Sequence, residues 1–364
     1  MTGAPYTRRA FSREALGLGE GDRPEFAGLT VGGSAINKPS AAASLGGIAG
    51  VAGFTRAYRV PLTGGSGGSD GYQLQLLVGE SSGSSGADFN VGGNSQDFPS
   101  GEDVGGDFKF VKSDGSVVPF YVERVTGVAP NRVATIWLAL PGGTSADVIF
   151  LLSGNSTSVA NQSDPATVFP DFFDSFPGTS LDTGKWTAVN STGVTVGSGS
   201  MRHTSSTGRV RSNAVFSGSG IILEALWNGV SRNTNGHIVG GFGSAAALTT
   251  NSIGYLWHPG QDFIRNNGIY VAQGTTRPTN TEILLRMTLT GSGIFSFVAI
   301  RHENYLTGAS LYSRTFINSV ASENIFLGNR FDGGFTGQAL DISWRWVRIR
   351  QQGTAPSIGT VVEV

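Results

Sequence analysis

Apolar residues alternate with polar ones along most of the chain beyond residue 53. In the segment GYQLQLLVGE, one face of an extended chain would carry Tyr72, Leu74, Leu76 and Val78. A period of two is typical of a strand that lays one face on a core. The alternation continues in DFKFVKSDGSVVPFYVERV, with a turn at 113–115, and in ATIWLALPGGTSADVIFLLSGN, with a Pro-Gly-Gly turn. We therefore predict a small β-sandwich domain over residues 53–164.

A second alternating series follows a proline-containing stretch at 158–178. Its members are GIILEALWNGV, SIGYLWH, DFIRNNGIYVAQ, TEILLRMTLTGSGIFSFVAIRH, ENIFLGNRF and LDISWRWVRIRQ. Short strands at close spacing are typical of a sandwich, and Asn267-Gly268 favours a two-residue hairpin turn. We predict a second sandwich over residues 165–352 and a C-terminal tail at 353–364.

The last segment of this series has an ambiguous pattern. Ile342, Trp344 and Trp346 share one face of a regular strand, whereas Val347 and Ile349 fall on the other. Either a bulge switches the faces or both faces are buried.

Residues 1–52 show no such alternation and end in the small-residue stretch KPSAAASLGGIAGVAG. This segment has too little apolar bulk to build a core. We predict an extended N-terminal segment, so the expected fold is all-β, with two sandwiches in series.

Composition agrees with an all-β chain and narrows the function. The 364 residues include 55 glycines and only 14% charged residues, which disfavours helices. The formal net charge of -1 gives no field that would recruit nucleic acid or an anionic membrane, and no apolar run is long enough to span a bilayer. Cysteine is absent, which excludes disulfides and thiolate chemistry.

The glycine-rich stretch LGLGEGDRPEFAGLTVGG at 16–33 fits neither a dinucleotide fingerprint nor a Walker loop. It resembles a segment of bacteriophage tail-fibre and other virion-fibre proteins that lies near the virion-proximal end. The resemblance implies contacts with other virion proteins (tail, portal or capsid) and self-association, expected as a homotrimer. The residues expected at these contacts are Leu16, Leu18, Phe26, Leu29 and Val31.

Two later stretches carry further resemblances. DFKFVKSDGSVVPFYVE with ADVIFLLSGNSTSV resembles a β-domain of unassigned function that precedes lectin-like domains in microbial and viral surface proteins. FFDSFPGTSLDTGKW and SWRWVRIRQ are similar to the first and last strands of concanavalin A-like sandwiches of the laminarinase and laminin-G type. The second sandwich is therefore expected to be a concanavalin A-like jelly roll.

Hydrolytic machinery of that family is not apparent. Laminarinase-type enzymes carry a Glu-x-Asp-x-x-Glu-like run, whereas the segment IILEALWNG offers Glu224 alone. Arg345 stands where the family often has a calcium-binding aspartate, and the four histidines show no metal-ligand spacing and are expected on the surface or in loops. We predict that the chain is not an enzyme and that it uses no cofactor or metal.

Glycan binding is the chemistry that remains. Aromatic faces flanked by Asn, Asp and Arg hold sugars in lectin-like sites, although an aromatic residue at strand spacing is more often part of a core. The candidate glycan-binding residues are Trp257, His258, Asp262, Arg232, Trp227 and Tyr255.

We predict a structural virion protein of a bacteriophage, a tail or head fibre that binds host surface polysaccharide or lipopolysaccharide through its second sandwich. It would be assembled in the host cytoplasm and function on the extracellular particle. One alternative is a capsid or tail decoration protein that binds only virion partners. Another is a polysaccharide-degrading tailspike.

Overall fold

The computed structural model describes residues 30–31, 34–35, 48 and 52–364, except 156–159, 206, 218–219, 232–236, 244–252, 258–262, 267–268, 273–278, 291–295, 308, 319–321 and 331–340. The described part contains one short helix, α2 (Pro165–Val168), and otherwise β-strands. The predicted all-β fold class is confirmed. Near the N-terminus, the described residues pair as β1 (Thr30–Val31) with β2 (Ser34–Ala35).

The first sandwich is built from two sheets. One has the order β25-β3-β9-β6, with β26 also paired to β3, and the other has the order β5-β4-β8-β7. The strands are β3 (Arg56–Thr63), β4 (Tyr72–Gly79), β5 (Phe89–Asn90), β6 (Lys109–Lys112), β7 (Phe120–Thr126), β8 (Val133–Leu140), β9 (Asp147–Ser153), β25 (Ser357–Ile358) and β26 (Val362–Glu363).

The predicted alternation of apolar and polar residues identifies the core of this sandwich. Tyr72, Leu74, Leu76 and Val78 of β4 all lie in one buried cluster with apolar residues of the facing sheet. The turn at 113–115 also forms where predicted: Gly115 has a φ of 83°, and the Ser116 backbone N–H donates to the Asp114 carboxylate.

The C-terminal residues are part of the first sandwich. Ser357 and Ile358 pair with Thr63 and Leu62, and β26 pairs with Arg59 and Tyr58 of the same strand. The segment expected to be a tail therefore extends a sheet whose other strands lie some 200 to 300 residues earlier. The second sandwich is inserted between two parts of the first.

The second sandwich also has two sheets. The larger has the order β12-β13-β24-β15-β20-β21-β22, with β10 also paired to β24, and the other has the order β11-β14-β23-β16-β17-β18-β19. The strands are β10 (Phe172–Asp174), β11 (Trp186–Asn190), β12 (Val194–Gly197), β13 (Ser200–His203), β14 (Arg209–Ser217), β15 (Ile221–Ser231), β16 (His237–Phe242), β17 (Ile253–Trp257), β18 (Phe263–Asn266), β19 (Ile269–Ala272), β20 (Glu282–Thr290), β21 (Ser296–Asn304), β22 (Ser310–Asn318), β23 (Ser322–Arg330) and β24 (Asp341–Gln351).

Both explanations offered for the last strand apply to β24. Its pairing with β15 shifts register beside Arg345, because Leu226 faces Trp346 while Trp227 faces Trp344. Trp344 belongs to the core between the two sheets, whereas Trp346 is buried on the outer face. Trp344 and Trp346, which would share a face in a regular strand, therefore lie on opposite faces, because one extra residue at the bulge reverses the alternation.

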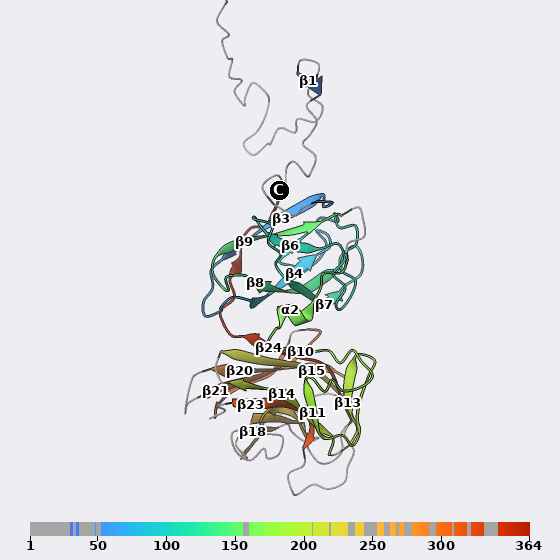
Figure 1. Cartoon of the computed structure of the whole chain (residues 1–364), viewed down its shortest axis with the longest axis vertical. Coiled ribbons are helices and arrows are strands. Elements are labelled where there is room, and N and C mark those ends of the chain that lie inside the picture. The colour runs from blue at the N-terminus through green and yellow to red at the C-terminus, as the bar shows by residue number, and fades with distance from the viewer. Residues whose placement is uncertain are drawn as a thin grey trace, which may run out of the picture.

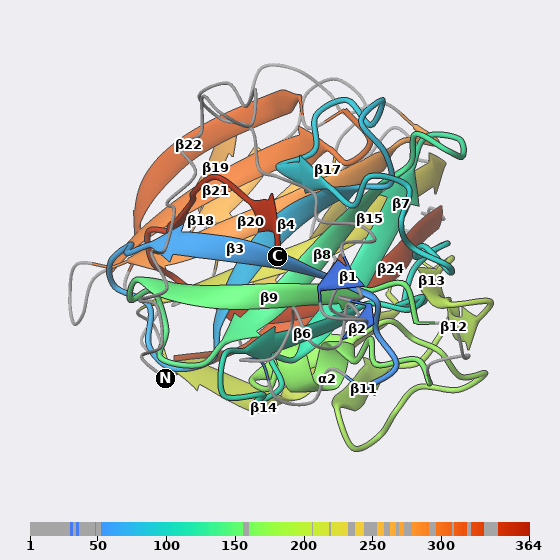
Figure 2. The same cartoon turned by 90° about the horizontal axis from the view of Figure 1, so that it is seen from above.

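The two sandwiches stack end to end, with α2 at their junction (Figure 1). The chain enters the first sandwich just before β3, and its C-terminus lies beside the same strand (Figures 1 and 2). The point where the chain enters the first sandwich and the C-terminus therefore both lie at the end of this sandwich that faces away from the second. Among the described residues, no helix has the length and apolar character needed to cross a membrane.

Candidate functional site

Among the described residues, the junction between the sandwiches brings together the buried charged side chains Glu123, Glu224 and Arg348. β7 and β8 of the first sandwich face the outer side of β15, β20 and β24 of the second. A third apolar core joins them, made of Tyr121, Trp137, Val168, Phe169, Phe173, Leu226, Leu284 and Trp346. This arrangement explains why β8 and β24 are buried on both faces.

Arg348 is the centre of a buried ion cluster within this junction. Its Nη1 lies 2.6 Å from Glu123 of the first sandwich, and its Nη2 lies 2.7 Å from Glu224 of the second. Arg286 also pairs with Glu224 at 2.7 Å. The Arg350 Nε is 3.1 Å from Glu224, an ion-pair distance without hydrogen-bond geometry. Because single buried charges are costly, each carboxylate here is matched by guanidinium groups.

The protonation of Glu224 follows from these partners. Burial acts to raise the pKa of its carboxyl group, but the charges of Arg350, Arg348 and Arg286 outweigh that effect and hold the pKa well below its ordinary value. The carboxylate has no solvent-exposed surface. Glu224, the nearest sequence candidate for a hydrolytic carboxylate, therefore lies buried in the junction, where the surrounding arginines favour its ionised form.

Aromatic rings enclose the Arg348 guanidinium. Its Cζ lies 4.4 Å from the ring centroids of Trp137 and Trp346 and 4.7 Å from that of Phe169. Such cation–π contacts suit the planar, weakly hydrated guanidinium. The Trp137 indole also donates a hydrogen bond to Glu123. The junction is thus a buried contact in which charged groups pair with one another and pack against aromatic rings.

A cleft of about 230 Å³ opens at the edge of this junction. Glu102 reaches it from the first sandwich, and Glu282 and Arg345 reach it from the second. Arg345 bridges the two carboxylates: its Nη1 is 3.2 Å from Glu282, and its Nη2 is 3.3 Å from Glu102. Burial raises the pKa of Glu102, and the nearby Arg345 charge opposes that rise. Tyr305 and the exposed Leu306 line the same cleft.

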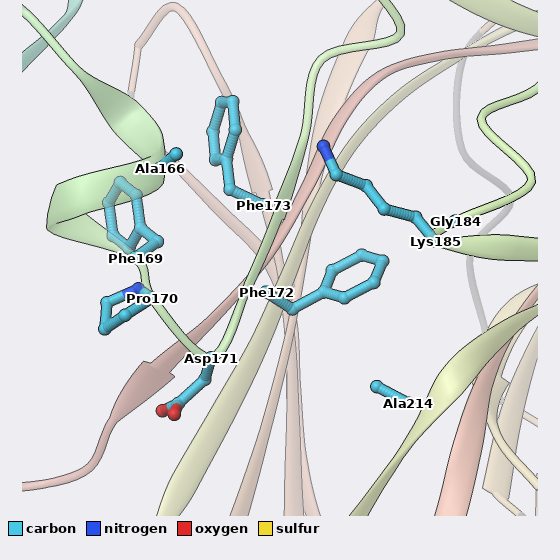
Figure 3. A pocket seen from close by; sticks show the side chains of 9 residues that line it. All are labelled: Ala166, Phe169, Pro170, Asp171, Phe172, Phe173, Gly184, Lys185 and Ala214. Carbon is cyan, nitrogen blue, oxygen red and sulfur yellow. The ribbon is translucent and has the colours of Figure 1, made fainter.

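A groove of about 280 Å³ lies beside α2, where the concanavalin-like motif FFDSF begins (Figure 3). The rings of Phe169 and Phe173 stand on one side of the view and Lys185 on the other. Phe172 packs edge-on against Trp186 with ring centroids 5.2 Å apart, and Phe169 stacks on Phe173 at 5.8 Å. These rings are at least 92% buried, so they offer a ligand little surface. The cleft has the richer set of accessible polar groups.

The structure corrects the placement of the predicted glycan-binding aromatic residues. Trp227, Tyr255 and Trp257 are fully buried in the core of the second sandwich. The Trp227 ring lies 5.6 Å from Tyr255 and 5.5 Å from Trp257, centroid to centroid. These strand positions alternate toward the facing sheet, so no ring face is left for a sugar.

The positions of the other predicted contact residues are not tested by the described part of the structure. Arg232, His258 and Asp262, and likewise Leu16, Leu18, Phe26 and Leu29, lie outside the described residues. Val31 is in β1, but its side chain is not described. In the described part of the chain, no group of three or more His, Asp or Glu residues could hold a metal ion.

The junction residues were missed because their sequence pattern indicates solvent. Trp346, Arg348 and Arg350 alternate on one face of β24, and charged residues at alternate positions normally mark an exposed face. Glu123 and Glu224 are the sequence features that could have indicated buried ion pairs, because they are acidic residues within largely apolar stretches of their strands. Only their spatial proximity identifies them as partners of the arginines.

Comparisons with known proteins concern the fold. The profile of a domain of unknown function (DUF2341) matches residues 104–189, across the junction between the sandwiches. No curated protein matches the sequence. Among solved structures, a chain from work on endo-acting O-glycanases of human gut bacteria that initiate mucin breakdown is 16% identical, covers 50% of this chain and 98% of its own, and has a TM-score of 0.38.

Two mycobacterial structures are similar to a comparable extent. A beta-1,3-glucanase from Mycobacterium marinum is 14% identical, covers 49% of this chain and 97% of its own, and has a TM-score of 0.34. An immunostimulatory antigen and pseudo beta-1,3-glucanase of Mycobacterium tuberculosis is 13% identical, covers 50% and 98%, and also has a TM-score of 0.34. The chain is thus similar to jelly-roll β-sandwich proteins of the glycosyl hydrolase type.

The prediction that the chain is not an enzyme is wrong as it stands. It is overturned by the similar structures, which include glycan-degrading enzymes. No particular activity is carried over, because identities of 13–16% concern the fold alone.

Proposed function

We propose that the chain is an attachment protein of a bacteriophage virion, a tail or head fibre that binds host surface glycan through its second sandwich. The proposal rests on where the chain enters the first sandwich and where its C-terminus lies. Residues 52–56 and Val364 lie at the same pole of the first sandwich, and the second sandwich is at the opposite end of the molecule (Figure 1). A particle that held the chain by the segment before residue 52 would present the second sandwich outward.

The sequence of residues 16–33 supports the anchoring half of the proposal, because it resembles the virion-proximal segment of fibre proteins. Its apolar residues would be buried against tail, portal or capsid proteins and against copies of this chain in a homotrimer. Trimers repeated around a particle bind multivalently, so weak single sites suffice for attachment.

The glycan half is supported by the jelly-roll fold and by the chemistry that remains available. With Trp227, Tyr255 and Trp257 in the core, the proposed sugar contacts of the second sandwich are Arg232, His258 and Asp262. Guanidinium, imidazole and carboxylate groups can together donate to and accept from sugar hydroxyls.

A glycan array of bacterial polysaccharides and lipopolysaccharides, probed with the full chain, tests the glycan half. We expect binding to a limited set of glycans, and weaker binding to the same set after removal of residues 1–51, because the deletion removes multivalency. Light scattering on the two chains tests the anchoring half, because the deletion should reduce the oligomer mass. An unchanged mass would contradict the anchoring role, and an array without signal would contradict glycan recognition.

The glycans that bind should also be assayed for newly formed reducing ends, since hydrolysis would indicate a degrading spike. We expect Glu224→Gln to lower stability but to leave any such release unchanged per folded molecule, because Glu224 is sealed in the junction. Loss of release in folded Glu224→Gln protein would show that the junction opens to substrate.

A further inference from the structure

We propose that the cleft between the sandwiches, lined by Glu102, Glu282, Arg345 and Leu306, binds a single neutral sugar ring through its hydroxyl groups. This site lies on the outer side of the eight-stranded sheet. Its residues are different from Arg232, His258 and Asp262, the contacts proposed above. The inference rests on the proposed function only in assuming that the chain meets glycans.

The polar groups of the cleft alternate in a way that suits a sugar. Carboxylate, guanidinium and carboxylate follow one another as Glu102, Arg345 and Glu282. Carboxylates accept hydrogen bonds from hydroxyl groups, and a guanidinium donates them. Vicinal hydroxyl groups of a pyranose present donors and acceptors at neighbouring positions, so they can bond to this row.

These groups are accessible and have capacity to spare. The side chains of Glu102, Glu282 and Arg345 are 33%, 24% and 48% exposed. Arg345 has one nitrogen directed at each carboxylate, so the second oxygen of Glu282 is left for a ligand. The second oxygen of Glu102 accepts a hydrogen bond from the Tyr121 hydroxyl at 3.2 Å and keeps one lone pair. Leu306 is 68% exposed and supplies an apolar surface for the CH groups of a ring. Exposed leucine beside polar groups is the mixed lining that sugar recognition requires.

The cleft is held open before any ligand arrives. Glu123, which lines the cleft, accepts hydrogen bonds from Arg348 at 2.6 Å and from the Tyr305 hydroxyl at 2.9 Å. Both bonds link the first sandwich to the second. Glu123 is consequently engaged. Glu282 offers a ligand an oxygen, and Glu102 offers the lone pairs that Tyr121 and Arg345 do not use. A preorganised site avoids the ordering cost that weakens flexible ones.

Size and charge define the ligand class. The volume of about 230 Å³ is below the roughly 300–1,000 Å³ of pockets for drug-sized ligands, so the cleft suits one ring rather than a chain. Two carboxylates at the rim would repel a uronate or sialate. The expected ligand is a neutral hexose or N-acetylhexosamine at a chain end.

Saturation-transfer NMR and calorimetry with methyl glycosides test the site in the full chain. The probes are a panel of methyl hexosides, methyl N-acetylhexosaminides and methyl glucuronide. We expect millimolar binding of at least one neutral glycoside and none of the glucuronide. Glu282→Gln and Glu102→Gln should each weaken that binding about tenfold, because each removes a charge-assisted hydrogen bond.

Glu363→Gln is the matched control, because Glu363 pairs with Arg56 at the opposite pole and should leave binding unchanged. Thermal unfolding would show whether each variant folds. If Glu102→Gln does not fold, Glu282→Gln still tests the site. Equal binding by the parent and both cleft variants would overturn the site while leaving glycan recognition by the second sandwich intact. Preferential binding of the glucuronide would overturn it as well. Absence of binding to any glycoside, together with a blank glycan array, would overturn both proposals.

Discussion

His203 shows how one buried residue makes stability depend on pH. Its ring is fully buried in β13, with Nδ1 3.1 Å from the Gly208 carbonyl oxygen and Nε2 without a partner. The expected surface or loop position is therefore wrong for this histidine. Burial lowers its pKa from 6.5 to about 4, and the hydrogen bond to Gly208 offsets this only in part.

We expect this histidine to weaken the fold in acid. Between pH 6.5 and 4 the unfolded chain binds a proton that the folded chain excludes, so stability falls as the pH falls through this window. The free energy of unfolding should drop by about 2 kcal/mol between pH 7 and pH 5 from His203 alone. Urea unfolding at several pH values, with the His203 ring followed by NMR, measures both quantities. A ring that titrates near pH 6.5 in the folded protein would contradict the expectation.

Trp257 is the residue for which the two interpretations of the sequence differ most. As a buried ring in the core, Trp257→Ala should lower the free energy of unfolding by about 3–5 kcal/mol through loss of burial and a residual cavity. Ile269→Ala is the control, because Ile269 is 68% exposed and its loss should change stability by about 0.5 kcal/mol or less. Denaturant unfolding decides. A stable Trp257→Ala protein with reduced glycan binding would restore the ligand interpretation.

At the scale of elements, alternation predicts strands well and their partners poorly. β4 follows from Tyr72, Leu74, Leu76 and Val78, because a half-buried strand must alternate. The outer face of β24 could not be identified in this way. Its polar residues Arg348, which is buried, and Arg350, which is partly buried, are covered by the other sandwich instead of facing solvent. Local sequence records which side chains are polar, but not which distant strand neutralises them. The interdomain cleft was unpredictable for the same reason.

The C-terminal strands are the element that sequence patterning left unassigned. β25 and β26 each contain two residues, too short for any period to show, yet Ile358 and Val361 pack against the first core. Deleting residues 356–364 should remove this partial burial and expose the edge of β3, lowering the free energy of unfolding by about 2 kcal/mol. Denaturant unfolding of the deletion, beside Glu363→Gln as control, measures the effect. A deletion as stable as the parent would show that β3 needs no added strand.

At the scale of the whole molecule, the junction makes two sandwiches into one unit. The chain crosses it twice, before β10 and after β24, and Arg348 joins Glu123 on one side to Glu224 on the other. Separating the sandwiches would expose the third apolar core and leave ionised groups without partners. An isolated 165–352 fragment would carry that surface into solvent. Binding experiments therefore require the complete pair.

We expect the pair to unfold in a single transition and Arg348→Met to weaken it strongly. Removing the guanidinium leaves Glu123 without its buried cationic partner, a change that typically lowers stability by about 3–5 kcal/mol. The control is Arg202→Met, which removes a more exposed pair with Asp341 within the second sandwich and should change stability by about 1 kcal/mol or less. Calorimetry of the parent should give equal calorimetric and van't Hoff enthalpies, because neither sandwich can unfold without exposing the junction of the other. Two separate transitions in the parent, with Arg348→Met altering neither, would mean that the buried charges only fill the space between independent domains.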